Sequence, residues 1–598
     1  MTRLFNDPAS FTEDMVTGFA AAHAEHVRAV HGGVVRATPG AQGKVAVLTG
    51  GGSGHYPAFC GVVGPGFADG SVIGNIFTSP SSAQAHSVAV EADRGGGVLF
   101  LFGNYAGDVM NFGLAAQQLN AEGIPAQCFA VTDDIASAPA DDADRRRGIA
   151  GDFTVFKTAS AAAEEGASLE EVVRVAERTN ALTRTLGVAF DGCTLPGQDE
   201  PLFTVPEGKL GLGLGIHGEP GVRESALGTA EELAHTLVEG LLAERPADAG
   251  DRVAVILNGL GSTKYEELYV VWGTVSRLLA EAGLTLVRPE VGELVTSLDM
   301  AGCSLTVTWL DEDLERLWLT PTDTPAFRRG DAGFARSASP HEGVGSRSAG
   351  AERVGTPERQ PQAQPAPSGT PAQGGQGGGA PTATPAQGAG ADTAAYAVRA
   401  LHTAQTLLHQ EADALGRLDA IAGDGDHGRG MCKGVDAALA AAQRVHGEGA
   451  APAAVLATAG EAWAAEAGGT SGALWGAGLR ALGAGLPADR EPTPAELAEA
   501  AKAALTAVTA LGKAEPGDKT LVDALHPFVT AFTRELEAGA APGKALATAA
   551  TEAHTAAEAT ADLVPRLGRA RPLAERSVGT PDPGAVSLAA VLGALPTA

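Results

Sequence analysis

The sequence predicts a multidomain protein: an N-terminal α/β domain of two subdomains, a disordered Pro/Gly-rich linker and a C-terminal all-α helical barrel or bundle. Three observations carry this prediction. Short apolar runs of strand length alternate with helical stretches over residues 1–330, as in α/β domains. Over residues 331–391 Pro, Gly, Ala, Ser and Gln dominate without apolar periodicity, which is typical of a flexible linker. Alanine-rich helical patterns fill residues 392–598, which favours a helical bundle.

The strand candidates of the first domain are short apolar runs, several of which end in Gly or Asn turns, as buried parallel strands do. They cover residues 45–49, 98–102, 127–131 and 252–257. A change of pattern near residues 185–190 indicates the division into two subdomains. The helices predicted for the last domain include residues 394–415, 495–511 and 543–563.

The predicted linker contains G-G-Q-G-G-G-A-P and repeated T-P-A-Q segments. A flexible chain of about 60 residues has a root-mean-square reach of roughly 40 Å. The flanking domains can therefore meet within one chain or across a dimer.

Charge and composition limit the partners and the location. The chain has 598 residues and a formal net charge of -29, which disfavours nucleic acids and anionic membranes because no basic patch offsets it. No apolar run approaches the roughly 20 residues of a membrane span, and the N-terminus lacks a signal-peptide pattern. We therefore expect a cytoplasmic protein. The five cysteines include no C-x-x-C pair, so neither a disulfide framework nor a zinc site follows.

The densest metal-binding chemistry lies in residues 418–431, L-D-A-I-A-G-D-G-D-H-G-R-G-M. Asp419, Asp424 and Asp426 would be gathered by a turn at the glycines, and such carboxylate oxygens suit Mg²⁺ with phosphates in its shell. The H-G-R-G segment that follows is predicted to be a loop that offers backbone N–H groups to phosphate. An Asp/Gly-rich surface turn is the alternative explanation.

Two further segments lie in the first domain. Residues 50–55, G-G-G-S-G-H, follow a predicted strand and would let backbone amides approach a small polar ligand. Asp108 follows the strand at 98–102, where α/β sheets hold ligands. His217 lies in G-L-G-L-G-I-H-G-E-P-G, where we expect an exposed side chain. Taken alone, a structural turn and a structural histidine remain alternatives.

Seven segments together, in order, resemble the ATP-dependent dihydroxyacetone kinases. They are T-G-G-G-S-G-H-Y-P-A-F-C-G, G-N-Y-A-G-D-V-M-N-F, G-I-H-G-E-P-G, G-D-G-D-H-G, G-G-T-S-G-A-L-W-G, A-E-P-G-D-K-T-L-V-D-A-L and S-V-G-T-P-D-P-G-A. The resemblance implies a ketose-binding α/β domain followed by a helical domain that holds ATP through Mg²⁺.

In the first domain, the resemblance implies that His217 adds through an imidazole nitrogen to the substrate carbonyl and forms a hemiaminal. A neutral imidazole suits this addition, which would reject glycerol because glycerol has no carbonyl. The resemblance also implies that Asp108 is the base near the phosphorylated hydroxyl and that His55 is its acid/base partner. The implied substrate-binding positions are Gly52, Ser53, Gly54, His55 and Asp108.

In the second domain, the resemblance implies that Asp419, Asp424 and Asp426 are Mg²⁺ ligands. Thr470 and Ser471 would contact phosphates at a helix start, where free amides favour anions, and Arg569 would stabilise charge. The implied nucleotide-binding positions are His427, Gly428, Arg429, Gly430, Thr470, Ser471, Gly512, Leu521, Arg569, Asp582, Pro583 and Gly584.

The sequence departs from the family pattern at two places. Many members have a lysine where this chain has Gly103, before N-Y-A-G-D. The segment that usually reads R-A-S-Y-L-G reads R-A-R-P-L-A at residues 569–574. A roomier pocket without the lysine is expected to favour a four-carbon ketose such as erythrulose.

The resemblance therefore predicts an ATP-dependent kinase that phosphorylates a terminal hydroxyl of a short ketose, dihydroxyacetone or a close analogue. The alternatives are an erythrulose kinase of the same family, a flavin-nucleotide cyclase on the same nucleotide site, and a non-catalytic regulatory partner. A phosphotransferase-system version is disfavoured because both domains are fused in one chain. The expected partners are the ketose, ATP with Mg²⁺ and a second copy of the chain in a homodimer.

Overall fold

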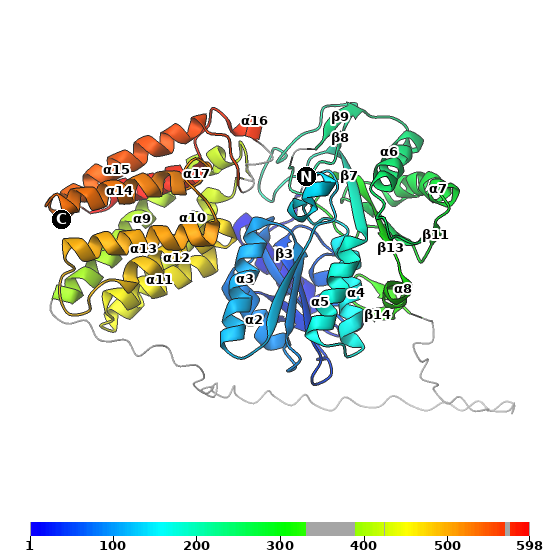
Figure 1. Ribbon diagram of the computed structural model, residues 1–598, viewed down its shortest axis with the longest axis horizontal. Helices are drawn as coiled ribbons and strands as arrows, with labels where there is room; N and C mark the ends of the chain where they lie inside the picture. Colours follow the sequence, from blue (N-terminus) through cyan, green and yellow to red (C-terminus); the bar gives the residue numbers. More distant parts are fainter. Residues whose placement is uncertain (1, 220, 331–388, 424, 568–573, 597–598) are drawn as a thin grey trace, which may run out of the picture.

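The structure is a computed structural model that describes residues 2–219, 221–330, 389–423, 425–567 and 574–596. An α/β domain precedes residue 331, and a domain of helices alone begins at residue 389 (Figure 1). The predicted fold class is confirmed for both domains. The predicted linker falls almost entirely on residues outside the described ranges, although the first helix of the second domain already includes residues 389–391.

The first sheet of the α/β domain has the strand order β1-β2-β4-β3-β5-β6. Strands β4, β3, β5 and β6 run parallel to one another, whereas β2 is antiparallel to both β4 and β1. Its strands are β1 (Val27–Val30), β2 (Gly33–Arg36), β3 (Ala46–Ser53), β4 (Gly70–Ile76), β5 (Val98–Gly103) and β6 (Ala126–Val131).

Helices cover both faces of this sheet. Phe100 and Phe102 of β5 pack with one buried cluster, whereas Leu99 and Leu101 pack with another, because successive side chains of a strand point to opposite faces. The first cluster includes residues of α2 and α3, and the second includes residues of α4 and α5. These helices are α2 (Ser82–Ala92), α3 (Ala106–Ala121), α4 (Asp152–Glu164) and α5 (Leu169–Ala181).

Strand β3 is longer than predicted. The sequence suggested that it ends at Thr49, but residues 50–53 stay in the strand because Gly50, Gly51 and Gly52 continue the pairing with β4. Only Gly54, with a φ of 104°, leaves the extended conformation. The glycine run is therefore mostly the end of a buried strand and not a loop.

The second sheet is mainly antiparallel, with the order β11-β10-β13-β7-β8-β9 and with β12 paired to β10. The subdivision predicted near residues 185–190 falls within β7, the first strand of this sheet along the chain. Its strands are β7 (Thr183–Asp191), β8 (Lys209–Leu212), β9 (Arg223–Ala226), β10 (Arg252–Gly259), β11 (Thr285–Leu286), β12 (Glu290–Gly292) and β13 (Ala301–Trp309). The remaining elements of this domain are η1 (Pro8–Ser10), α1 (Phe11–Ala22), η2 (Cys60–Val62), η3 (Ala140–Arg145), α6 (Ala230–Ala243), α7 (Tyr265–Glu281), α8 (Glu312–Leu319), β14 (Thr322–Asp323) and β15 (Arg328–Arg329).

The second domain is a ring of antiparallel helices in which α17 returns to contact α9 (Figure 1). Small alanine side chains allow close packing, and the buried Trp463 stacks on Trp475 with ring centroids 4.7 Å apart. Its elements are α9 (Ala389–Asp419), α10 (His427–Gly447), α11 (Pro452–Ala467), α12 (Gly469–Ala484), α13 (Pro494–Gly512), α14 (Val522–Glu537), α15 (Pro542–Ala559), η4 (Thr560–Asp562), α16 (Ala574–Ser577) and α17 (Pro583–Ala594). Within the described residues, no helix combines the length and the apolar character that a membrane crossing requires.

The two domains touch where β4 ends and α12 begins. The Gly469 N–H donates to the Ser79 carbonyl oxygen (3.1 Å), and the Asn111 side-chain amide donates to the Gly469 carbonyl oxygen (3.1 Å). The Thr78 hydroxyl donates to the Asp426 carboxylate (2.5 Å). The helical domain therefore lies directly over the ends of the first sheet.

Candidate active site

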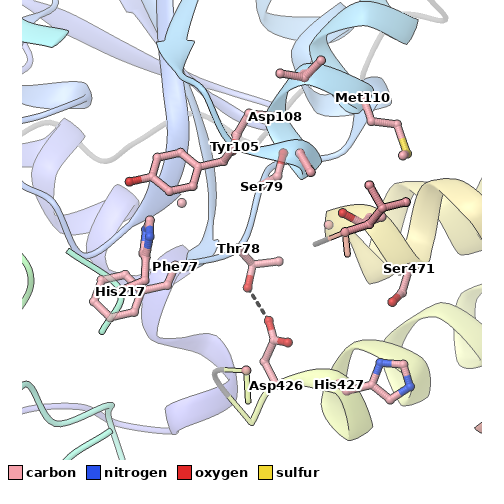
Figure 2. A pocket seen from close by; sticks show the side chains of 18 of the residues that line it. Phe77, Thr78, Ser79, Tyr105, Asp108, Met110, His217, Asp426, His427 and Ser471 are labelled. Carbon is pink, nitrogen blue, oxygen red and sulfur yellow. Dashed lines mark hydrogen bonds between the residues drawn. The ribbon is translucent and has the colours of Figure 1, made fainter. Parts of the chain in front are cut away.

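A cavity of about 810 Å³ lies between the two domains and is lined by both. Figure 2 shows Phe77, Tyr105 and His217 on the α/β side and Asp426, His427 and Ser471 on the helical side. Its size falls within the range of small-molecule sites. The predicted site residues that line it are Gly52, His55, Asp108, His217, Asp419, Asp426, His427, Gly430, Thr470, Ser471, Gly512, Leu521, Asp582, Pro583 and Gly584.

Four predicted residues are not brought to the cavity. Ser53 turns away, because its hydroxyl forms a 3.0 Å hydrogen bond with Thr12. Gly54 packs under the Phe77 ring, where an added Cβ would lie 2.8 Å from it. Gly428 packs on α9, where a Cβ would collide with the Ala412 carbonyl oxygen, and Arg429 is exposed. Two other predicted residues, Asp424 and Arg569, lie outside the described residues.

His217 is held by a carboxylate that the sequence analysis did not single out. Glu219 accepts hydrogen bonds from both the His217 backbone N–H and the His217 ring Nδ1, each at 3.0 Å. The prediction that the His217 side chain is exposed was wrong, since this side chain is only 11% accessible. The sequence signal for this partner was the acidic residue two positions after the histidine.

The state of Glu219 follows from its neighbours. Burial alone would raise the pKa of this carboxyl, but His217 and Arg147 outweigh burial and hold the pKa well below its usual range. Arg147 lies 3.7 Å from Glu219 and is itself paired with the buried Asp134 at 2.8 Å. Glu219 is therefore ionised and keeps the proton of the His217 ring on Nδ1. The other ring nitrogen, Nε2, points to a different group.

Nε2 of His217 faces a second histidine. The two Nε2 atoms of His55 and His217 lie 3.0 Å apart, although the residues are separated by 162 positions in the chain. His55 Nδ1 lies 2.8 Å from the Thr296 carbonyl oxygen, which can only accept, so His55 also carries a proton on Nδ1. A hydrogen bond between the two Nε2 atoms would therefore require one further proton between the rings.

Aromatic rings enclose this histidine pair. Phe77 stacks on His55 with centroids 5.0 Å apart and meets His217 edge-on at 5.1 Å. Tyr105 meets His217 edge-on at 4.8 Å, and its hydroxyl donates to the Gly148 carbonyl oxygen (3.1 Å). Neither ring was found from the sequence, because single aromatic residues near glycines carry no distinctive signal.

The space beside Gly103 is shared with Tyr105. A Cβ at Gly103 would lie 2.9 Å from the Tyr105 ring and 3.0 Å from the Gly148 carbonyl oxygen. The absent side chain therefore allows Tyr105 to lie against the backbone here.

Asp108 lies in the first turn of α3, is 8% exposed and lines the cavity. Its neighbour Gly107 faces the helical domain, since a Cβ there would lie 3.6 Å from the Thr470 hydroxyl oxygen. This carboxyl thus lies on the wall of the cavity, at the start of α3 (Figure 2).

Three helix N-termini of the second domain line the cavity. The prediction of a loop for the H-G-R-G segment was wrong: the segment is the first turn of α10, with Asp426 at the N-cap position. Thr470 and Ser471 start α12, and Pro583 and Gly584 start α17. Helix N-termini present unpaired N–H groups and favour anions such as phosphate.

Carboxylates surround the same part of the cavity. Among the described residues, no group of three or more His, Cys, Asp or Glu side chains is placed to hold a metal ion. Asp419 and Asp426 both line the cavity, and the third predicted ligand, Asp424, lies between them in the chain. Burial, Asp523 and Asp419 raise the pKa of Asp582 to about 7. Oxygen donors with such excess negative charge fit a hard divalent cation that also binds phosphate.

Comparisons with known proteins place both domains. A family model described as the Dak1 domain matches residues 17–326, and one described as the DAK2 domain matches residues 421–597. A D-erythrulose kinase of Mycolicibacterium smegmatis is 58% identical over 589 residues, which cover 98% of this chain and 97% of the relative. An L-erythrulose kinase of Pectobacterium atrosepticum is 52% identical over 600 residues, which cover 100% of this chain and 96% of the relative.

A solved structure is also similar over nearly the whole length. The crystal structure of the dihydroxyacetone kinase from C. freundii in complex with AMP-PNP and Mg²⁺ covers 99% of this chain and 98% of its own, with 28% identity and a TM-score of 0.51. Both domains and their order thus match one family. The chain therefore belongs to the dihydroxyacetone kinase family.

Proposed function

We propose that this protein is an ATP-dependent kinase that phosphorylates a terminal hydroxyl of a short ketose, with erythrulose favoured over dihydroxyacetone. The single observation that carries the proposal is the shared cavity: a carboxylate-held histidine pair faces three helix N-termini across about 810 Å³. The preference for erythrulose, the alternative in the sequence analysis, is supported by two erythrulose kinases that match over nearly the whole chain.

His217 is proposed to bond to the carbonyl carbon of the ketose. Its Nε2 lone pair forms the new C–N bond, the carbonyl π electrons move to oxygen, and His55 delivers the shared proton to that oxygen. The ring of His217 then carries the positive charge that the pair shared before, and the Glu219 carboxylate, 3.0 Å from Nδ1, balances it. The 3.0 Å separation of the two Nε2 atoms supports this proton transfer.

Asp108 is proposed to accept the proton of the hydroxyl that is phosphorylated. Phosphoryl transfer needs the attacking oxygen and the phosphorus about 3 to 3.5 Å apart and roughly in line. The position of Gly107 supports this arrangement, because a Cβ there would lie 3.6 Å from the Thr470 hydroxyl oxygen, which places the first turn of α3 near the start of α12.

The N-terminal turns of α10, α12 and α17 are proposed to bind the phosphates of ATP. Asp419, Asp424 and Asp426 would hold Mg²⁺, which supplies charge neutralisation on the transferring phosphate when bound. We further propose that the protein acts in the cytoplasm as a homodimer. Light scattering should then give twice the mass of the chain.

An ADP-release assay tests the function. Dihydroxyacetone, glyceraldehyde, D-erythrulose, L-erythrulose and glycerol are compared with Mg-ATP, and the products are identified by ³¹P NMR. We expect one erythrulose enantiomer to give the highest kcat/KM and glycerol to give no product. Absence of a phosphorylated ketose with every substrate would overturn the proposal.

A further inference from the structure

A buried carboxyl in the cavity is used neither by the fold nor by the proposed mechanism. Asp152 is the first residue of α4, lines the cavity and is 3% exposed. Its buried Oδ1 atom has no hydrogen-bond partner among the described residues. Leaving a buried polar atom unpaired costs stability, so such an atom in a binding cavity points to a ligand group.

The surroundings of Asp152 favour its uncharged form. Burial, followed by the nearby carboxyls of Asp133 and Asp108, raises its pKa well above the usual range. A protonated carboxyl offers one O–H donor and one carbonyl acceptor, which together match an alcohol hydroxyl. An ionised carboxylate would only accept.

The carboxyl lies in a corner formed by two glycines and a tyrosine. A Cβ at Gly148 would lie 2.5 Å from Asp152 Oδ1 and 2.5 Å from the Gly103 Cα. The Tyr105 hydroxyl donates to the Gly148 carbonyl oxygen, and the Tyr105 ring lies against His217. This corner therefore shares Tyr105 with the His217 site and lies in the same cavity.

The corner belongs to the α/β domain alone. The nearest neighbours of Gly148 are Asp152, Gly103 and Val131, all from this domain, whereas Gly107 faces Thr470 of the helical domain. A ketose bonded through its carbonyl carbon to His217 has two arms. If one arm points to the phosphates, the other is directed toward this corner.

We propose that Asp152 is a specificity-determining residue that hydrogen-bonds the hydroxyl of the ketose arm opposite the phosphorylated one. The inference rests on the proposed function, since it assigns a subsite within the same ketose site. It explains why the chain keeps an unpaired carboxyl oxygen in this cavity. A purely structural role, as an acidic residue in the first turn of α4, is the competing explanation.

The test compares substrates with and without that hydroxyl in the full-length protein. Erythrulose and dihydroxyacetone carry it, whereas hydroxyacetone has only the hydroxyl that is phosphorylated. In the wild type we expect kcat/KM for erythrulose to exceed that for hydroxyacetone by about 100-fold or more, since a site built for a hydroxyl rejects the analogue that lacks it. Asp152→Ala should reduce this ratio about 10-fold or more, mainly by lowering kcat/KM for erythrulose.

Two further variants separate recognition from damage. Asp152→Asn should keep most of the ratio, because a carboxamide also has a donor and an acceptor. Glu244→Gln changes a carboxyl that pairs with the buried Arg146 (2.7 Å) and does not line the cavity. It should leave the ratio within about threefold of wild type, since it removes no substrate contact.

The outcomes are distinguishable. The inference is supported if Asp152→Ala lowers the ratio and melts at or above the wild-type temperature, because it removes an unpaired polar atom. Equal losses on both substrates with a lower melting temperature, or the same change of ratio in Glu244→Gln, would overturn it while the proposed function stands. If the wild type phosphorylates none of these ketones, the proposed function fails and the inference falls with it.

Discussion

Replacing Glu219 by glutamine tests how the structure prepares His217. Glu219 presents two oxygens to two donors, the His217 backbone N–H and the ring Nδ1–H, both at 3.0 Å. A carboxamide has only one oxygen, so its NH₂ group must face one of these donors. The His217 ring escapes the conflict by moving its proton to Nε2, which removes the lone pair that attacks the ketose.

The size of the effect follows from the bond that is lost. A hydrogen bond to a charged group contributes about 1.5–3 kcal/mol. If this free energy is lost from the transition state, kcat/KM falls roughly 10- to 150-fold, at about 1.36 kcal/mol for each factor of ten. Arg147, 3.7 Å from Glu219, also loses a charge partner, so the effect should lie toward the upper end.

The assay measures kcat/KM for erythrulose in Glu219→Gln and in a matched control, Glu244→Gln. Glu244 also pairs with a buried arginine, Arg146, at 2.7 Å but does not line the cavity. The control should keep kcat/KM within about threefold of wild type, because it touches no substrate. Activity of Glu219→Gln within the same threefold range would refute the reasoning that a carboxylate sets the His217 proton.

Three further predictions concern metal binding, domain contact and pH. Asp424→Ala combined with Asp426→Ala should abolish Mg-ATP binding in calorimetry and leave ketose binding intact; unchanged Mg-ATP affinity would contradict the metal assignment. Thr78→Val removes the 2.5 Å hydrogen bond to Asp426. Because one hydrogen bond contributes about 0.5–1.5 kcal/mol, kcat/KM should fall roughly 2- to 10-fold. A larger kcat/KM than wild type would show that this contact opposes catalysis. Burial, and secondarily Arg329, lowers the pKa of Lys157 from 10.5 to about 7. Between these pH values the unfolded chain binds one proton more than the folded chain, so the free energy of unfolding rises by about 1.4 kcal/mol per pH unit. Lys157→Met should lose this part of the rise in urea unfolding between pH 7 and 9, and an unchanged slope would refute the lowered pKa.

The sequence was sufficient to predict the strands and site residues that belong to local motifs. The strands predicted at residues 98–102 and 127–131 are β5 and β6 within one residue at each end, because buried parallel strands are continuous apolar runs. His217, Asp108 and Asp426 were found through glycine-rich segments, and the structure brings all three to one cavity.

What the sequence could not supply are contacts between distant segments. His55 and His217 face each other across 162 positions, and Arg147 reaches Glu219 from another loop. The glycine run after Thr49 was not predicted to be part of the strand, because its pairing with β4 depends on the tertiary structure. Asp152 carries no local signal, since an acidic residue at a helix start is common for reasons of the helix alone.

The bond between His217 and the ketose is the central claim, and ¹³C NMR tests it most directly. The full-length protein is mixed with erythrulose labelled at the carbonyl carbon, without ATP, and compared with His217→Ala. We expect the wild type to lose the ketone signal and gain a protein-bound tetrahedral-carbon signal that His217→Ala lacks. A bound ketose that keeps its ketone signal in the wild type, or a tetrahedral signal that persists in His217→Ala, would contradict the account.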